Sequence, residues 1–205
     1  MRIPSVLFIS ITKTLYFSAR FRGQIIVMRG TRILLQRGAR IELAPGGRLY
    51  LGRNRFAAWP LTIRIDRNGR LTIGGVVQIS RGSRILVGEN AHLELENEAY
   101  LNYDASITCW DHISIGKGAG LSWNTNVIDG NFHELSVRGR ALPRTQPVRI
   151  GERVLIGAGA TIVGASIGDG SVVGAGSVVF SDMPARALVN GNPARATVKD
   201  ISWLE

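Results

Sequence analysis

The chain has 205 residues, of which 45% are hydrophobic and 25 are glycine, and it carries a formal net charge of +10 at pH 7. This length suits a single domain with a sizeable core. Its one cysteine, Cys109, excludes internal disulfides and cysteine-based zinc sites, and is compatible with a reducing compartment. We expect this thiol to pack as a small apolar side chain and to take no part in catalysis.

The positive charge is concentrated in the N-terminal third of the chain. Residues 1–70 carry 14 Lys and Arg against two acids, Glu42 and Asp66, whereas the remaining residues carry 11 against 13. A basic region of this kind indicates an anionic partner, such as nucleic acid, phospholipid head groups or phosphate-linked glycans. The alternative is a solvated face with no partner.

Residues 1–23 predict a helix that ends near Gly23. Leu7, Ile11 and Leu15 recur at steps of four, which places them on one helical face. The apolar run is too short to span a bilayer, and no convincing small-residue cleavage site follows it. Basic and aromatic residues accompany the apolar ones, so the helix either caps the domain that follows or lies on an anionic membrane surface.

Residues 24–127 predict short strands. Apolar side chains alternate with others in units such as Ile41-Glu42-Leu43 and Leu71-Thr72-Ile73, and Gly-rich turns separate the units. The segment Arg53–Pro60 breaks this pattern and is expected to bulge out of the strands.

From residue 95 to residue 113 the apolar positions recur at steps of six. Glu94, Glu96 and Glu98 alternate with them and are therefore expected to point outward. Three carboxylates at this spacing suggest a metal site, but a solvated strand face is the better interpretation.

The stretch Val148–Val179 is organised in steps of six residues. Ile150, Ile156 and Ile162 each open a unit, Gly mostly follows, and a small residue takes the fifth place; the step from Ile162 to Ile167 is one residue short. Neither a helical period nor simple alternation gives this pattern. It predicts a solenoid in which three units close one triangular coil and the aliphatic side chains stack inward on their copies.

The segments VRIGERVLIGAGATI, IGDGSVVGAGSVV and GNPARA resemble the C-terminal coils and closing turn of the hexapeptide-repeat acyltransferases. The N-terminal extension, the many Arg residues and the expected membrane contact resemble members that O-acetylate sugars of cell-surface polysaccharide. The resemblance is specific over residues 121–198. It implies an all-β solenoid, a left-handed parallel β-helix with a short N-terminal helix and a C-terminal closing turn. The expected parts are a helical cap or membrane-contact segment (1–23), the β-helix acyltransferase domain (24–198) and a C-terminal tail (199–205).

A loop leaves the coils at about residues 128–147, because the repeat breaks after Val127 and resumes only at Val148. Long excursions from a rigid scaffold are common places for functional residues. The loop carries His133, and its surroundings resemble the catalytic segment of the family: a Trp-Asn pair, an Asp, the His and then Pro-Val-x-Ile-Gly.

The resemblance implies that His133 is a general base in a direct acyl transfer. A neutral imidazole takes the proton of an alcohol or amine that attacks the thioester of acetyl-coenzyme A. A polar neighbour should fix the tautomer, and Glu134, Asp129 and Asn131 all remain open for this role. The resemblance places the oxyanion donor at the backbone N–H of Ala158, which in the family can come from a neighbouring subunit. The residues expected at the acceptor are Trp123, Asn124, Asp129 and Asn131.

The coenzyme is expected along the outside of the C-terminal coils, with backbone groups facing the pantetheine arm and basic side chains at the phosphates. The residues expected to bind it are Gly157, Ala175, Gly176, Ser177, Arg195 and Lys199. The chain departs from the family in having Asn131 where many members have Asp, Leu155 where many have Trp, and Phe180-Ser181 in place of a Thr-Lys pair, for which Arg186 is a candidate substitute.

We therefore expect an acetyl-CoA-dependent O-acetyltransferase that acts as a homotrimer on a hydroxyl of a sugar or glycan, which can be lipid-linked. The expected location is the cytoplasm, peripherally at the inner face of the membrane. Nucleic acid is not an expected partner, because the chain has no nucleic-acid motif and few aromatic residues for base stacking.

Two alternatives use the same fold. One is a non-catalytic scaffold that binds an anionic partner through the basic coils. The other is a zinc enzyme of the γ-carbonic-anhydrase kind, with His92, His112 and His133 as ligands because they lie 20 and 21 residues apart. That class places two ligands a few residues apart, a spacing absent here, so no metal site is expected.

Overall fold

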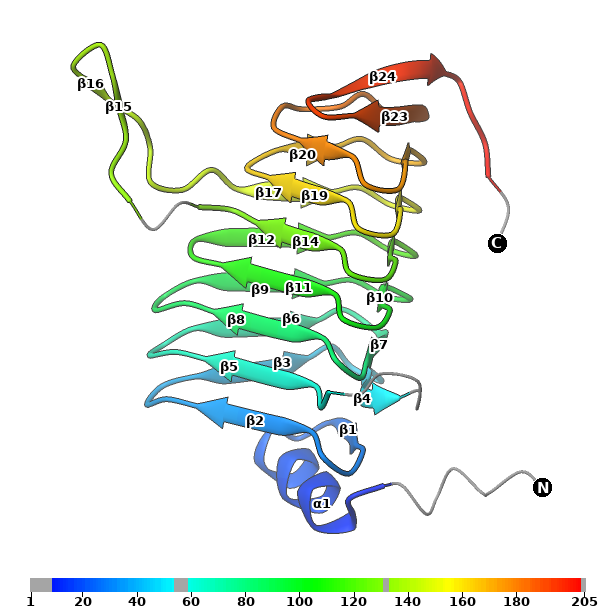
Figure 1. The fold of residues 1–205 in the computed structure, drawn as a ribbon. Coiled ribbons are helices and arrows are strands. Elements are labelled where there is room, and N and C mark those ends of the chain that lie inside the picture. Colours follow the sequence, from blue (N-terminus) through cyan, green and yellow to red (C-terminus); the bar gives the residue numbers. More distant parts are fainter. Residues whose placement is uncertain (1–8, 54–58, 131–132, 204–205) are drawn as a thin grey trace.

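A computed structural model describes residues 9–53, 59–130 and 133–203. Among the described residues the chain forms one helix, α1 (Ile11–Arg20), and 24 strands that wind into a tapering three-sided solenoid (Figure 1). Three parallel sheets form its sides. Among the described residues, antiparallel strand pairs lie in a hairpin on the loop and at the C-terminal end, and isolated antiparallel bridges join Ile9 to Met28 and Gly130 to Thr145.

The strands of each sheet follow one another along the solenoid. The first sheet contains β1 (Gln24–Val27), β4 (Arg48–Arg53), β7 (Val76–Ser80), β10 (Tyr100–Leu101), β13 (Gly120–Leu121), β18 (Leu155–Ile156), β21 (Val172–Val173), β23 (Ala187–Gly191) and β24 (Ala194–Lys199). The second contains β2 (Arg32–Leu35), β5 (Thr62–Ile65), β8 (Arg84–Val87), β11 (Ser106–Cys109), β14 (Asn126–Ile128), β19 (Thr161–Val163) and β22 (Val178–Val179). The third contains β3 (Arg40–Leu43), β6 (Arg70–Ile73), β9 (His92–Leu95), β12 (His112–Ile115), β17 (Val148–Ile150) and β20 (Ser166–Ile167), and the loop hairpin is β15 (Ser136–Val137) with β16 (Arg140–Ala141).

Stacked aliphatic side chains form the core. In the second sheet Ile63, Ile85, Ile107, Val127 and Ile162 are register partners from one coil to the next, and all five are buried. Full burial of each such side chain contributes about 1.5–3 kcal/mol. Because every coil contacts only its neighbours, this inward stack and the parallel backbone ladders together hold consecutive coils in place.

The coils shorten toward the C-terminus. Register partners lie 22 residues apart at Thr62 and Arg84, but 17 apart at Thr161 and Val178. The short step predicted between Ile162 and Ile167 is absorbed at Gly164, which has a φ of 52° and whose N–H donates to the carbonyl of Ile128 at 2.9 Å. A glycine makes this tight corner without steric cost.

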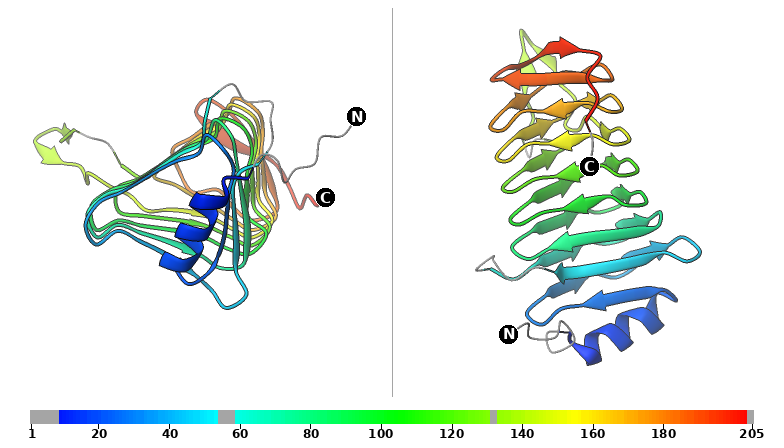
Figure 2. Two further views of the ribbon diagram at one scale, coloured as in Figure 1. Left: turned by 90° about the horizontal axis from the view of Figure 1, so that it is seen from below. Right: turned by 90° about the vertical axis from the view of Figure 1, so that its right-hand side faces the viewer.

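Two segments leave the coils. The bulge predicted at Arg53–Pro60 lies largely outside the described residues, but Arg32 and Thr62 are register partners 30 residues apart, which leaves room for it. The second segment connects β14 to β17 and carries the β15–β16 hairpin, which projects away from one corner of the solenoid (Figures 1 and 2).

Helix α1 lies across the N-terminal end of the solenoid (Figure 2). The helix provides hydrogen-bond partners for the open edge of β1. The hydroxyl of Ser18 accepts a hydrogen bond from the Ile25 N–H, and that of Thr14 accepts one from the Val27 N–H, each at 3.0 Å. Phe17 is buried against the first coil. These contacts make the helix a cap on an otherwise unpaired strand edge. The large apolar side chains that it leaves exposed are Ile11, Leu15 and Tyr16.

No helix in the described part of the chain combines the length and the apolar character needed to cross a membrane.

Candidate functional site

The loop between β14 and β17 is closed at its base. The N–H of Gln146 donates to the carbonyl of Asp129 at 2.6 Å, and Gly130 and Thr145 form an antiparallel bridge. Beyond this base the described loop is almost entirely exposed, including His133. The hydrogen-bonded base of the loop therefore places His133 outside one corner of the solenoid.

Of the three candidates to orient His133, two are engaged elsewhere. Glu134 forms an ion pair with Arg144 across the loop, and the carboxylate of Asp129 is bonded to the main chain. Asn131 lies outside the described residues. In the described part of the chain no hydrogen bond holds the His133 ring.

Asp129 has a structural task that its sequence context did not reveal. Its carboxylate is buried and accepts the N–H of Trp110 at 2.7 Å and that of Asp111 at 2.9 Å, on the preceding coil. Both oxygens are used to anchor the start of the loop. These contacts give Asp129 a positioning role, and the acceptor contact expected of it stays a prediction. Burial raises the pKa of the adjacent Cys109 thiol, and the Asp129 charge adds to that shift.

Three turns stack at the corner between the first and second sheets. The N–H of Gly159 donates to the carbonyl of Trp123, and the N–H of Gly176 donates to the carbonyl of Ala158, both at 2.8 Å. The stack brings together the turns that contain Trp123-Asn124, Gly157-Ala158 and Ala175-Gly176. We call it the turn column.

The lowest turn of the column holds the predicted acceptor residues Trp123 and Asn124. Trp123 is exposed, whereas Asn124 occupies the left-handed position of the turn with a φ of 55° and donates its N–H to the carbonyl of Tyr103. The backbone geometry explains this asparagine, because Asn tolerates that conformation better than most residues. Both residues are exposed at this turn.

The middle turn carries the predicted oxyanion donor. The N–H of Ala160 donates to the carbonyl of Gly157 at 3.1 Å, and Gly159 has a φ of 70°, which together describe a type II turn with Ala158 at its second position. The Ala158 N–H donates to no other described residue. A Cβ at Gly157 would lie 2.6 Å from the Ala175 nitrogen, so only glycine allows this spacing of the coils.

The upper turn and the closing hairpin hold the remaining predicted coenzyme residues. Ala175 and Gly176 are exposed, but Ser177 is buried and its hydroxyl accepts the N–H of Gly191 at 3.2 Å. Ser177 therefore fastens the hairpin of β23 and β24, and its role at the coenzyme stays a prediction. Arg195 and Lys199 are exposed on β24, and the candidate substitute Arg186 is paired with Asp200 at 3.6 Å.

Within one chain the loop and the turn column do not meet. The loop leaves between the second and third sheets, whereas the column joins the first sheet to the second. Figure 1 places the loop hairpin on the opposite side of the solenoid from β7 and β10 of the first sheet. His133 and Ala158 thus lie at different corners of the triangle.

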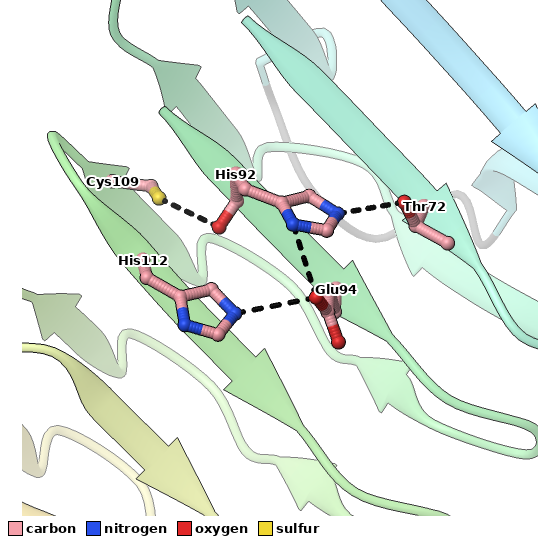
Figure 3. Close-up of polar contacts among 5 residues, drawn as sticks. All are labelled: Thr72, His92, Glu94, Cys109 and His112. Atoms are coloured by element: carbon pink, nitrogen blue, oxygen red, sulfur yellow. Dashed lines mark hydrogen bonds and ion pairs between the residues drawn. The ribbon is translucent and has the colours of Figure 1, made fainter. Parts of the chain in front are cut away.

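A cluster that the sequence did not predict lies on the outer face of the third sheet. His92, Glu94 and His112 approach one another there (Figure 3). Sequence spacing placed the two histidines in adjacent coils but assigned Glu94 to a solvated face and named His133, which lies on the loop, as the third ligand. The sequence pattern that could have predicted the cluster is His92-x-Glu94 followed by a second histidine, His112, in the next coil.

Comparison with known proteins finds a repeat model and named relatives that match part of the chain. The family described as "Hexapeptide repeat of succinyl-transferase" matches residues 147–181. YvoF of Bacillus subtilis, provisionally named an acetyltransferase, is 40% identical over 88 residues, 42% of this chain and 46% of its own length. Galactoside O-acetyltransferase of Escherichia coli is 33% identical over 120 residues, 58% of this chain and 56% of its own.

The structural comparison covers more of the chain. The crystal structure of the polySia-specific acetyltransferase NeuO superposes with a TM-score of 0.56 over 88% of this chain and 78% of that one, at 17% identity, a likeness in fold. The chain spans about half the length of the two relatives that it matches in sequence. The repeat match over residues 147–181 and the named relatives show that the C-terminal part of the chain is similar to hexapeptide-repeat acetyltransferases, and the shared fold extends that likeness in architecture over most of the chain.

Proposed function

We propose that this protein transfers an acetyl group from acetyl-coenzyme A to a hydroxyl of a sugar, with His133 as the general base. The hexapeptide-repeat match and the similarity to galactoside O-acetyltransferase support a sugar acceptor and O-transfer. They also support a left-handed sense for the coils.

The observation that carries the proposal is the separation of His133 from the turn column. An imidazole and an oxyanion donor at different corners of one triangular prism cannot act on the same carbonyl. Three copies arranged side by side about a threefold axis would bring the loop of one chain against the column of the next. We therefore propose a homotrimer with three equivalent sites between chains.

The reaction in such a site needs one proton transfer in each direction. The neutral His133 imidazole takes the proton of the sugar hydroxyl as its oxygen attacks the thioester carbonyl. The N–H of Ala158 donates to the oxygen that becomes negative in the tetrahedral intermediate. Collapse of that intermediate breaks the carbon–sulfur bond, and the imidazolium returns its proton to the leaving thiolate. No acyl-enzyme forms.

The binding of both substrates is assigned to exposed groups. The turn at Ala175-Gly176 offers backbone groups to the pantetheine arm, and Arg195 and Lys199 offer charge to the phosphates. On the acceptor side, exposed arginines on the early strands suit an acidic cell-surface polysaccharide or its lipid-linked precursor at the cytoplasmic face of the membrane, with the outer face of α1 toward the lipid. These arginines are Arg32, Arg40, Arg48, Arg64 and Arg70.

The direct test follows thiol release and thermal stability together. With acetyl-coenzyme A at 100 times its dissociation constant, linkage adds about 2.7 kcal/mol to the stability of the folded protein. We expect the His133→Ala variant to show the same stabilisation but to lose at least about a hundredfold in thiol release with a glycan acceptor. A scaffold protein would show neither stabilisation nor release, and that result would refute the proposal.

A further inference from the structure

The cluster on the third sheet is built by the register of two neighbouring coils. His92 of β9 and His112 of β12 are direct partners in the parallel ladder, and their rings stack with centroids 5.5 Å apart and planes at 17°. Glu94 lies two residues after His92 on the same face of β9. Figure 3 shows both imidazoles turned toward the Glu94 carboxylate.

The donor atoms converge on one point. Glu94 Oε1 lies 3.0 Å from His92 Nδ1 and 3.3 Å from His112 Nε2, and all three donor atoms lie within 4.8 Å of one another. A tetrahedral zinc ion with bonds of about 2.0–2.1 Å holds its ligand atoms about 3.3 Å apart. The two distances from Glu94 Oε1 to the histidine nitrogens are already close to this value. Rotation of the half-exposed His112 ring would shorten the distance between the two nitrogens.

The neighbours of His92 hold its ring in an orientation suited to metal binding. The Thr72 hydroxyl lies 2.8 Å from His92 Nε2, so it orients the ring and leaves Nδ1 toward Glu94. Outer partners of this kind accompany most metal-bound histidines. The buried Cys109 thiol donates a hydrogen bond to the His92 carbonyl at 3.3 Å and so holds the backbone of this residue.

We propose that His92, Glu94 and His112 form a binding site for a divalent metal ion of the Zn²⁺ class, which joins two consecutive coils just before the loop. Two imidazoles and one carboxylate suit Zn²⁺, Co²⁺ or Ni²⁺, whereas Mg²⁺ and Ca²⁺ prefer sites made of oxygen alone. Three protein ligands leave a fourth position open. Glu94 and His112 also line a cavity of about 550 Å³ that Lys117 and Arg149 share, so an open position has room for water.

The three histidines of this chain supply a matched set of variants. Untagged protein is stripped with a chelator, dialysed against Zn²⁺, Mg²⁺ or no metal, and analysed for bound metal and melting temperature. We expect one Zn²⁺ per chain and no Mg²⁺ in the wild type and in His133→Ala. We expect loss of that ion in His92→Ala and His112→Ala, and weaker binding in Glu94→Gln. At a hundredfold excess over its dissociation constant Zn²⁺ should raise the folding equilibrium constant about a hundredfold, and only in the proteins that bind it.

The visible absorption spectrum of bound Co²⁺ provides a second test that does not depend on protein stability. Co²⁺ bound by this ligand set should give the visible bands of a tetrahedral centre without a thiolate charge-transfer band. Circular dichroism of each variant separates loss of the ligand from loss of the fold, and Glu94→Gln serves if an alanine variant does not fold. Failure of the wild type to bind Zn²⁺ would overturn the proposal. So would a bound ion that survives in folded His92→Ala and His112→Ala but is lost in His133→Ala.

Discussion

Replacement of Ala158 by proline tests the assigned oxyanion donor without removing a side-chain contact. Ala158 occupies the second position of a type II turn, with Gly159 at φ 70° after it, and proline is favoured at that position. The substitution removes the N–H, which no other described residue accepts, and puts the Cδ of the proline ring on that nitrogen. The folded structure should therefore keep its turn, its melting temperature and its affinity for acetyl-coenzyme A.

The expected loss is confined to the chemical step. Removal of one oxyanion donor lowers kcat by about 10²–10³, equivalent to about 2.7–4 kcal/mol of transition-state stabilisation. Stopped-flow or steady-state release of free thiol measures kcat, and the KM for acetyl-coenzyme A should change little because the donor acts on charge that develops only in the transition state.

A matched control has the same geometry at another corner. Glu89 is the second residue of a turn in which the N–H of Ala91 donates to the carbonyl of Gly88 and Asn90 has a φ of 59°. Glu89→Pro should keep wild-type activity. If Ala158→Pro retains more than half of the wild-type kcat, or if both proline variants lose activity equally, the assignment of Ala158 is wrong.

Three further predictions concern the solenoid itself. Ile107→Ala opens a cavity in the inward stack and should destabilise the protein by about 2–5 kcal/mol in urea unfolding; a change below about 1 kcal/mol would contradict the packing described. Gly157→Ala places a Cβ 2.6 Å from the Ala175 nitrogen and should lower the melting temperature by pushing two coils apart, so an unchanged value would show that the coils have slack. Because burial raises the pKa of Cys109, its thiol should resist Ellman's reagent at pH 8 until the protein is unfolded, and rapid reaction of the native protein would show that the site opens.

The period-six repeat predicted the part of the fold that depends on inward side chains. Ile156 and Ile162 stack as expected, because an aliphatic residue at each step has one place to be buried. The shortening of the coils from 22 to 17 residues was not predictable, since the early units are degenerate and their turns differ in length.

The sequence was less informative about which polar residues serve the fold. Asp129 and Ser177 resembled ligand contacts, yet each satisfies backbone N–H groups of another coil, and those partners are known only once the register is known. Glu94 shows the reverse case. Its alternation predicted a solvated carboxylate, but the ladder places His112 beside it from 18 residues away.

The measurement that tests the central claim most directly is complementation between two inactive chains. In a trimer with sites between chains, a chain with His133→Ala still supplies Ala158, and a chain with Ala158→Pro still supplies His133. Random mixing at equal amounts should restore about a quarter of the wild-type activity, because one site in four pairs the two intact groups. Coexpressed chains that form mixed trimers but recover no activity would contradict the account, because both groups would then have to come from one chain.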